Sequence, residues 1–90
     1  MIRLFVRHTV KDFDAWKAGY DKGTEFRKEW GVLDHAVYRS SDDPNDITVM
    51  HDFDTLEHAK AFASSEGLAE RMRALGVSGP VQIWFAHESS

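Results

Sequence analysis

Apolar and polar residues alternate in four short segments of the chain, and this period of two predicts four strands. The segments are residues 2–9, 32–40, 47–53 and 81–87. In the third segment one face carries Ile47, Val49, His51 and Phe53, and the other carries Thr48, Met50 and Asp52. Because both faces hold large apolar groups, we expect neither side of this strand to be fully exposed to water.

Two longer segments have apolar residues at spacings of three and four, which is typical of amphipathic helices. The first covers residues 12–30 and begins at Asp12, an N-cap residue type. Within it, Gly19 and Gly23 predict a bend near Gly23 or a close approach by a neighbouring group. The second follows Asp54, which we expect to cap it, breaks at residues 64–65 and ends at Gly76.

The resulting order β-α-β-β-α-β is that of the α+β, ferredoxin-like fold, in which helices cover one face of a four-stranded antiparallel sheet. We expect residues 1–90 to form a single domain of this kind. The opposite sheet face is expected to carry Phe5, Val37, Met50 and Trp84 together with Arg3, Arg7, His35, Arg39, Asp52 and Gln82. That face is too apolar for water and too polar for a dry core. We therefore expect a homodimer, a dimeric α+β barrel, in which two such faces enclose a cavity.

Composition and charge exclude several classes of function. The chain has no cysteine, which excludes disulfides and thiolate chemistry and is typical of a reducing compartment. Neither a signal peptide nor a segment of transmembrane length is apparent, so we expect a cytoplasmic protein with no membrane partner. A net charge of −4 with scattered basic residues disfavours nucleic acid as a partner.

Four segments carry a resemblance to a known family. They are RHTVKDFDAWKAGYD (7–21), YRSSDDPND (38–46), HDFDTLEHAKAFASSEGL (51–68) and MRALGVSGP (72–80). Together they resemble the dimeric α+β-barrel superfamily, and specifically the small antibiotic-biosynthesis-monooxygenase-like and cyclase-like proteins of bacteria. Related branches of this superfamily include haem-degrading oxygenases and stress-response proteins.

The resemblance implies a small-molecule-binding barrel protein that acts as a cofactor-independent monooxygenase or cyclase-like enzyme on an aromatic or polyketide-like substrate. In such oxygenases the electron-rich phenol reacts with dioxygen itself, so no cofactor is expected. The haem-degrading branch would instead imply an iron ligand on a helix, here His58. The alternative is a non-catalytic ligand-binding or stress-response dimer.

Candidate site residues follow from the chemistry of a phenolate or enolate. His8 is a candidate general base, because imidazole titrates near neutrality; a strand-end histidine bonded to a neighbouring loop is the structural alternative. Arg7 and His35 are candidates for stabilising developing negative charge. The candidate substrate-binding residues are Arg3, Phe5, Met50, Asp52, Gln82 and Trp84. An ion pair between Asp52 and Arg3 or Arg7 is the structural alternative for these charges.

Five histidines raise the question of a metal site. They show neither HxH nor HxxxH spacing, so we expect no metal centre. His8 and His51 would come near each other if the first and third strands paired antiparallel.

Overall fold

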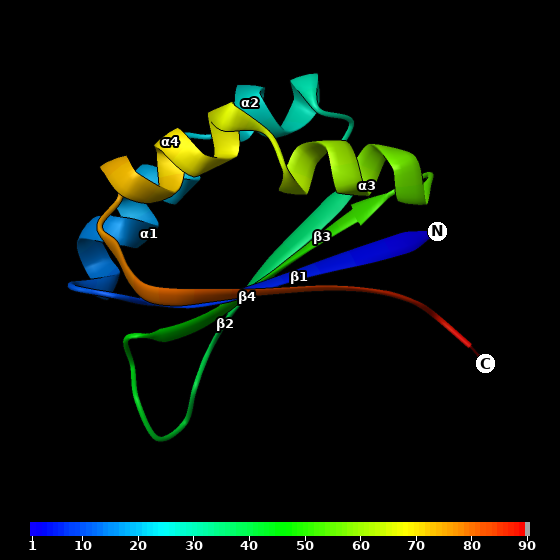
Figure 1. Cartoon of the computed structure of the whole chain (residues 1–90). Coiled ribbons are helices and arrows are strands. Elements are labelled where there is room, and N and C mark those ends of the chain that lie inside the picture. The colour runs from blue at the N-terminus through cyan, green and yellow to red at the C-terminus, as the bar shows by residue number, and fades with distance from the viewer. Residues whose placement is uncertain (90) are drawn as a thin grey trace.

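The structure is a computed structural model that describes residues 1–89. Its antiparallel sheet has the strand order β2-β3-β1-β4, formed by β1 (Ile2–Val10), β2 (Asp34–Arg39), β3 (Asp46–Phe53) and β4 (Val77–His87). The helices are α1 (Phe13–Asp21), α2 (Thr24–Glu29), α3 (Leu56–Ala63) and α4 (Glu66–Ala74). All of these helices lie on one face of the sheet and leave the other face uncovered (Figure 1). The predicted α+β, ferredoxin-like architecture is confirmed.

Each of the two predicted helical segments is divided into two helices. Gly23 lies between α1 and α2, where the predicted bend occurs, and it is buried. Ser65 separates α3 from α4, and its hydroxyl accepts a hydrogen bond from the Leu68 backbone N–H (3.1 Å). This side-chain cap satisfies a donor that the first turn of α4 would otherwise leave free. Across residues 1–89, no helix has the length and apolar character needed to cross a membrane.

The cap of α3 differs from the one predicted. Thr55, rather than Asp54, has the extended backbone of an N-cap, and its hydroxyl accepts from the His58 backbone N–H (3.2 Å). The Asp54 carboxylate instead contacts His58 Nδ1 at 2.6 Å. The prediction was wrong because two adjacent residue types can both cap a helix, and the first helical residue decides between them.

The last strand begins earlier than predicted, because residues 77–80 are part of β4. The pairing of β1 with β4 shifts register between Arg7 and Thr9, beside Gly79 and Pro80. Since β4 is an edge strand, Pro80 can lie in it without removing a ladder hydrogen bond from a central strand.

The core lies between the sheet and the helices. Leu4 and Val6 of β1 and Phe53 of β3 pack on Ala59 and Phe62 of α3. A second cluster joins strand residues Val10, Ile47 and Val49 to Trp16 and Tyr20 of α1. Burying these side chains is the main stabilising contribution to the fold.

The face assignment of β2 corrects the sequence prediction. In the β2–β3 register His35 is opposite His51, Val37 is opposite Val49 and Arg39 is opposite Ile47. Residues directly opposite one another share a sheet face, so His35, Val37 and Arg39 face the helices. Asp34, Ala36 and Tyr38 therefore lie on the sheet face that the helices leave uncovered, which we call the outer face. The prediction failed because β2 carries polar and apolar groups on both faces, which leaves its phase undetermined by alternation.

Candidate functional site

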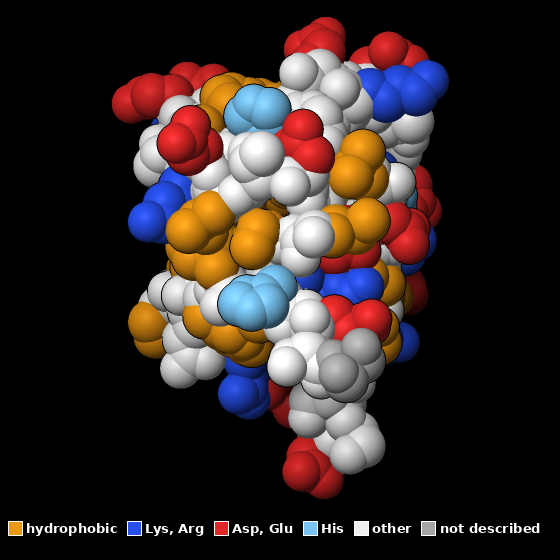
Figure 2. Space-filling model, turned by 90° about the vertical axis from the view of Figure 1, so that its right-hand side faces the viewer, with side chains coloured by type: hydrophobic (Ala, Val, Ile, Leu, Met, Phe, Trp, Pro, Cys, Tyr) orange, Lys and Arg blue, Asp and Glu red, His pale blue; other side chains and the backbone are white. Residues whose placement is uncertain are grey.

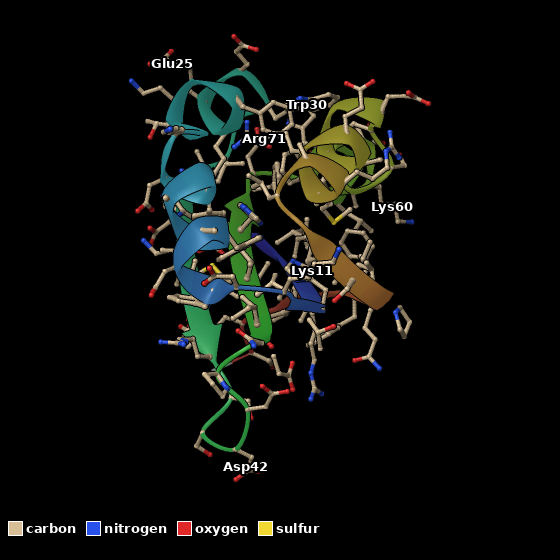
Figure 3. All side chains as sticks on the ribbon, turned by 90° about the vertical axis from the view of Figure 1, so that its left-hand side faces the viewer. Lys11, Glu25, Trp30, Asp42, Lys60 and Arg71 are labelled. Atoms are coloured by element: carbon tan, nitrogen blue, oxygen red, sulfur yellow. The ribbon has the colours of Figure 1, made fainter. Side chains whose placement is uncertain are left out.

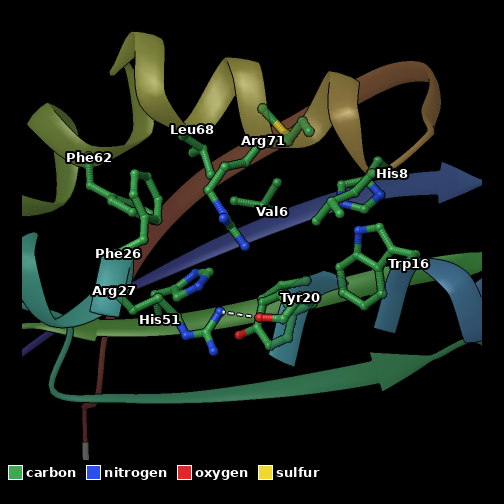
Figure 4. A pocket seen from close by; sticks show the side chains of 13 residues that line it. Val6, His8, Trp16, Tyr20, Phe26, Arg27, His51, Phe62, Leu68 and Arg71 are labelled. Atoms are coloured by element: carbon green, nitrogen blue, oxygen red, sulfur yellow. Dashed lines mark hydrogen bonds between the residues drawn. The ribbon is translucent and has the colours of Figure 1, made fainter. Parts of the chain in front are cut away.

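A cavity of about 50 Å³ lies between the helices and the inner face of the sheet. Its walls are almost entirely apolar, and the aromatic ones are Trp16, Tyr20, Phe26 and Phe62. Figure 4 shows these rings arranged along β1 and β3 beneath α3 and α4. The cavity also has polar lining residues, which are His8, Arg27, His51 and Arg71. We call it the inner cavity.

The two histidines come from the central strands. His8 and His51 are each 4 % exposed and occupy positions on the apolar, helix-facing sides of β1 and β3. The strands pair antiparallel, but His8 is opposite Ile47 and His51 is opposite Leu4. The two rings are therefore four residue positions apart, about 13 Å along the strands. They lie toward opposite ends of the inner cavity rather than side by side.

Burial keeps both imidazoles neutral. It lowers the pKa of His51 to about 3, with the positive charge of Arg27 acting in the same direction, and it also lowers the pKa of His8. The Nδ1 atom of each ring is buried without a hydrogen-bond partner. Leaving a buried polar atom unpaired costs roughly 1–3 kcal/mol. A neutral imidazole with a free nitrogen can accept a proton or bond a ligand hydroxyl.

Two arginines reach the inner cavity from different helices. Arg27 of α2 is buried; its Nη1 donates to the Tyr20 carbonyl (2.8 Å), and its guanidinium lies 4.1 Å from the centre of the Tyr20 ring. Arg71 of α4 donates from Nη2 to the Gly19 carbonyl (3.2 Å). In Figure 3, Arg71 lies between α2 and α4. Both arginines thus bond backbone carbonyls.

Tyr20 separates the inner cavity from His35. Its ring stacks on Trp16 with 5.0 Å between centroids, and its hydroxyl lies 2.9 Å from His35 Nδ1. Burial raises the pKa of Tyr20 to about 12, so the phenol is neutral near pH 7. Burial also lowers the pKa of His35. The predicted catalytic residue His35 therefore lies behind the cavity wall and contacts the inner cavity through Tyr20.

The other predicted site residues lie on the outer face of the sheet. Arg3 makes a two-pronged ion pair with Asp52, through Nε (2.8 Å) and Nη2 (2.9 Å). Arg7 pairs in the same way with Asp46 (3.1 and 2.7 Å). The hydrogen bond from Arg3 lowers the pKa of Asp52. The structural alternative predicted for Asp52 is therefore confirmed in its pairing with Arg3.

The apolar predicted residues gather beside these pairs. Trp84 stacks on Phe5 (5.2 Å between centroids), and Met50, opposite Phe5 in the register, is buried. Gln82 lies next along β4, opposite Arg7. These residues lie on the outer face together with Arg3, Arg7 and Asp52. Among the predicted site residues, His8 is the one that the structure places in the inner cavity.

A second pocket, of about 350 Å³, occurs at one end of the outer face. It is lined by Met1, Arg3, Phe5, Asp52, Ala86, His87 and Glu88. Figure 2 views the molecule from the side on which both chain ends lie, where apolar side chains alternate with charged ones. Three of the predicted substrate-binding residues, Arg3, Phe5 and Asp52, thus share one concave surface.

Sequence reasoning did not identify His51, Arg27 and Arg71 as site residues. A signal was present for two of them. His51 is a lone histidine on a strand face otherwise made of Ile47, Val49 and Phe53. Arg71 falls within the α4 stripe formed by Leu68, Met72 and Leu75, at spacings of three and four. In residues 1–89 no three His, Asp or Glu side chains converge as metal ligands.

Comparison with known proteins shows the fold. No protein-family model matches the chain, and no curated protein matches it. Among solved structures, an antibiotic biosynthesis monooxygenase-like protein from Bordetella bronchiseptica is similar with a TM-score of 0.82 and 18% identity, over 99% of this chain and 97% of that one. SnoaB, a cofactor-independent oxygenase from Streptomyces nogalater, is similar with a TM-score of 0.73 and 14% identity, over 98% and 94%.

An antibiotic biosynthesis monooxygenase structure covers 100% of both chains with a TM-score of 0.75 and 9% identity. The fold is therefore that of antibiotic biosynthesis monooxygenase-like proteins, as the sequence resemblance implied.

Proposed function

We propose that this protein binds a small aromatic substrate in the inner cavity and acts as a cofactor-independent monooxygenase. The observation that carries the proposal is the pairing of aromatic walls with buried neutral histidines whose Nδ1 atoms have no partner. Structures with this fold include SnoaB, a cofactor-independent oxygenase, which supports the choice of reaction class. The substrate class is an electron-rich phenol of the anthrone type, with an acidic CH₂ group.

The proposed reaction needs no external reductant. A base removes a proton from the substrate, and the resulting enolate transfers one electron to dioxygen. The substrate radical and superoxide then combine, forming a C–O bond, and the peroxide takes up a proton. Loss of water leaves a carbonyl, so that one oxygen atom enters the product, the other leaves as water and the CH₂ carbon is oxidised.

His8 is the proposed general base. Its ring is neutral at pH 7 because burial lowers its pKa, so it can accept the substrate proton at once. Its ring meets the edge of Trp16 (5.8 Å between centroids), which places the base beside an aromatic wall. The guanidinium of Arg71 supplies positive charge for the developing enolate. The dry, apolar remainder of the inner cavity strengthens that attraction.

Substrate entry requires the helices to move. A cavity of about 50 Å³ has room for a few water molecules but not for a fused aromatic ring system. Helix α4 is the element best suited to move, because none of its residues is fully buried. The cavity roof is formed by the half-buried Leu68 and Met72 of α4 and by Leu75, which follows the helix. Displacing α4 would widen the inner cavity without disturbing the buried strands.

We also propose that two copies of this domain pair through their outer faces as a dimeric α+β barrel. Trp84 is 42 % exposed and Tyr38 is 55 % exposed on this face, which is unfavourable in water. A partner sheet would cover both rings. The predicted roles of Arg3, Phe5 and Trp84 in substrate binding, and of Arg7 in stabilising developing charge, then become a competing proposal, with the substrate held between two subunits.

Oxygen consumption with a panel of anthrones tests the proposal. We expect turnover by the wild type and a fall in kcat of roughly a hundredfold or more for His8→Gln. The exposed His58→Gln is the matched control and should retain full activity. No consumption by the wild type would refute the oxygenase. A loss in Arg7→Ala and Trp84→Ala with none in His8→Gln would instead place the substrate on the outer face.

The second candidate function is non-catalytic ligand binding, and the small size of the inner cavity favours it. If α4 does not move, the space suits a ligand no larger than a few atoms. Anaerobic calorimetry with the same anthrones separates the two functions. Binding without later oxygen consumption would support the non-catalytic module.

A further inference from the structure

Two guanidinium groups converge on Gly23. A Cβ atom added at Gly23 would lie 2.5 Å from Arg71 Nη2 and 2.9 Å from Arg27 Nη1. A side chain at this buried position would require the ends of both arginine side chains to shift. Glycine therefore leaves room for two cations, one from α2 and one from α4, to approach the same point.

Neither cation forms an ion pair with a carboxylate in the described part of the chain. The ion pairs found among residues 1–89 join Arg3 to Asp52, Arg7 to Asp46, Lys17 to Asp21 and His58 to Asp54. Arg27 and Arg71 take part in none of them. Arg27 is 6 % exposed, and its Nε is buried without a hydrogen-bond partner. A buried cation without an anion is unfavourable, and a second nearby cation increases the cost.

The surroundings favour a negative charge that comes from a bound ligand rather than from a side chain of the protein. Both guanidiniums line the inner cavity, where the other titratable groups are His8, His51 and the neutral phenol of Tyr20. Both imidazoles are neutral at pH 7, and neither carries negative charge. A ligand must therefore bring the compensating charge with it.

The geometry favours a carboxylate. An arginine presents its N–H groups as a planar fork that matches the two oxygens of a carboxylate. The free Nε–H of Arg27 is one unused donor of such a fork. Once the inner cavity has widened to admit a substrate, its apolar walls Phe26 and Phe62 suit an aromatic ring attached to that carboxylate.

We infer that Arg27 and Arg71 form a subsite for the carboxylate of an aromatic acid, on the side of the two guanidinium groups that lines the inner cavity. This inference rests on the proposed function, since it places the substrate ring in the same inner cavity and adds carboxylate binding to the role proposed for Arg71. It narrows the substrate from any electron-rich phenol to one that also carries an acid group.

The free donor of Arg27 gives a direct spectroscopic test. In protein labelled with ¹⁵N-arginine, we expect benzoate to shift the Arg27 Nε–H signal, while the neutral isostere benzamide leaves it in place. The Nε–H signals of Arg3 and Arg7 are internal controls, because those groups already bond Asp52 and Asp46. An equal response to benzamide, or a response confined to Arg3 and Arg7, would overturn the subsite.

A pair of variants on α4 tests the second arginine. We expect Arg71→Gln to weaken benzoate binding by about tenfold or more, because a charge-assisted hydrogen bond is lost. Arg71→Lys keeps the charge and should restore part of the affinity. The exposed Arg73→Gln is the matched control, with a change below about twofold. Wild-type affinity in a folded Arg71→Gln variant would overturn the subsite.

Benzoate binding is measured without oxygen or turnover, so the subsite and the oxygenase can fail separately. Benzoate binding with no oxidation of any phenolic acid would keep the subsite and refute the oxygenase. Oxidation of neutral anthrones, with no preference in binding for benzoate over benzamide, would support the oxygenase and refute the subsite.

Discussion

The inner cavity and the outer face contain the same residue types in opposite states. On the outer face, Arg3 and Arg7 each have a carboxylate on the neighbouring strand, with both oxygens bonded. In the inner cavity, Arg27 and Arg71 bond single backbone carbonyls. The outer pairs are satisfied by the chain itself, so they need no ligand. The inner groups are left with unused donors and acceptors.

The difference shows that a candidate site is marked by polar groups that lack a partner, rather than by residue type. Strand register places Arg3 directly opposite Asp52, and a cross-strand ion pair follows from that geometry. No register partner exists for a helix arginine that points into a cavity. The outer face was chosen from the sequence because its mixture of apolar and charged residues suits neither water nor a dry core, and the inner cavity also combines arginines with aromatic rings.

The largest expected difference between the two regions is in stability. Phe62 is 1 % exposed and contacts the rings of Phe26 and Phe53. We expect Phe62→Ala to lower the free energy of unfolding by about 3–5 kcal/mol, because it leaves a cavity in the core. Trp84→Ala removes a stacked but partly exposed ring and should cost less, about 0.5–1.5 kcal/mol. Urea denaturation measures both losses of stability. A larger loss for Trp84→Ala than for Phe62→Ala would contradict the location of the core.

The next effect is the pH dependence of stability. The folded pKa of His51, about 3, lies below the unfolded value of 6.5, so the unfolded state binds more protons in between. Stability is therefore full above pH 6.5 and is lost as the pH falls toward 3. His51 alone should lower the free energy of unfolding by about 2 kcal/mol between pH 7 and pH 5.

A matched pair of variants isolates this effect. His51→Gln should reduce the loss of stability between pH 7 and pH 5, whatever its stability at pH 7. Phe62→Leu perturbs the same inner cavity but removes no titratable group, so it should lower stability equally at both pH values. An unchanged pH slope in His51→Gln would mean that the ring is accessible to water.

The smallest expected effect concerns assembly through the outer face. We expect the wild type to be a dimer in analytical ultracentrifugation at micromolar concentration. Trp84→Ala should raise the dimer dissociation constant by up to about tenfold, which corresponds to roughly 1.4 kcal/mol. Leu56→Ala, at an exposed position on α3, is the control and should not change it. A wild-type monomer would refute the barrel and with it the shared cavity.

Much of the architecture could be predicted from the sequence. The alternation in β1, β3 and β4 gave the correct faces, because each has one strongly apolar side. The phase of β2 could not be predicted, since Val37 and Ala36 lie on opposite faces and neither side dominates. His35 and Arg39 are held inward by Tyr20 and Phe13, contacts made across the fold.

The candidate site was harder to predict for a related reason. His8 was identified because it ends a strand near a helix. Arg27 was missed because an arginine on a helix is usually exposed, whereas here its guanidinium packs over the Tyr20 ring and beside Gly23. Sequence spacing locates a residue on an element, whereas an unpaired donor appears after the elements have packed.

The location of the ligand is the central claim, and the methionines offer a direct test of it. Met72 lines the inner cavity, and Met50 lies on the outer face opposite Phe5. With methionine methyl groups labelled by ¹³C, the protein can be titrated anaerobically with 2,5-dihydroxybenzoate and followed by NMR. We expect ligand-to-methyl Overhauser contacts and a shift at Met72, with Met50 unchanged. Contacts at Met50 and none at Met72 would place the ligand on the outer face and contradict the inner site.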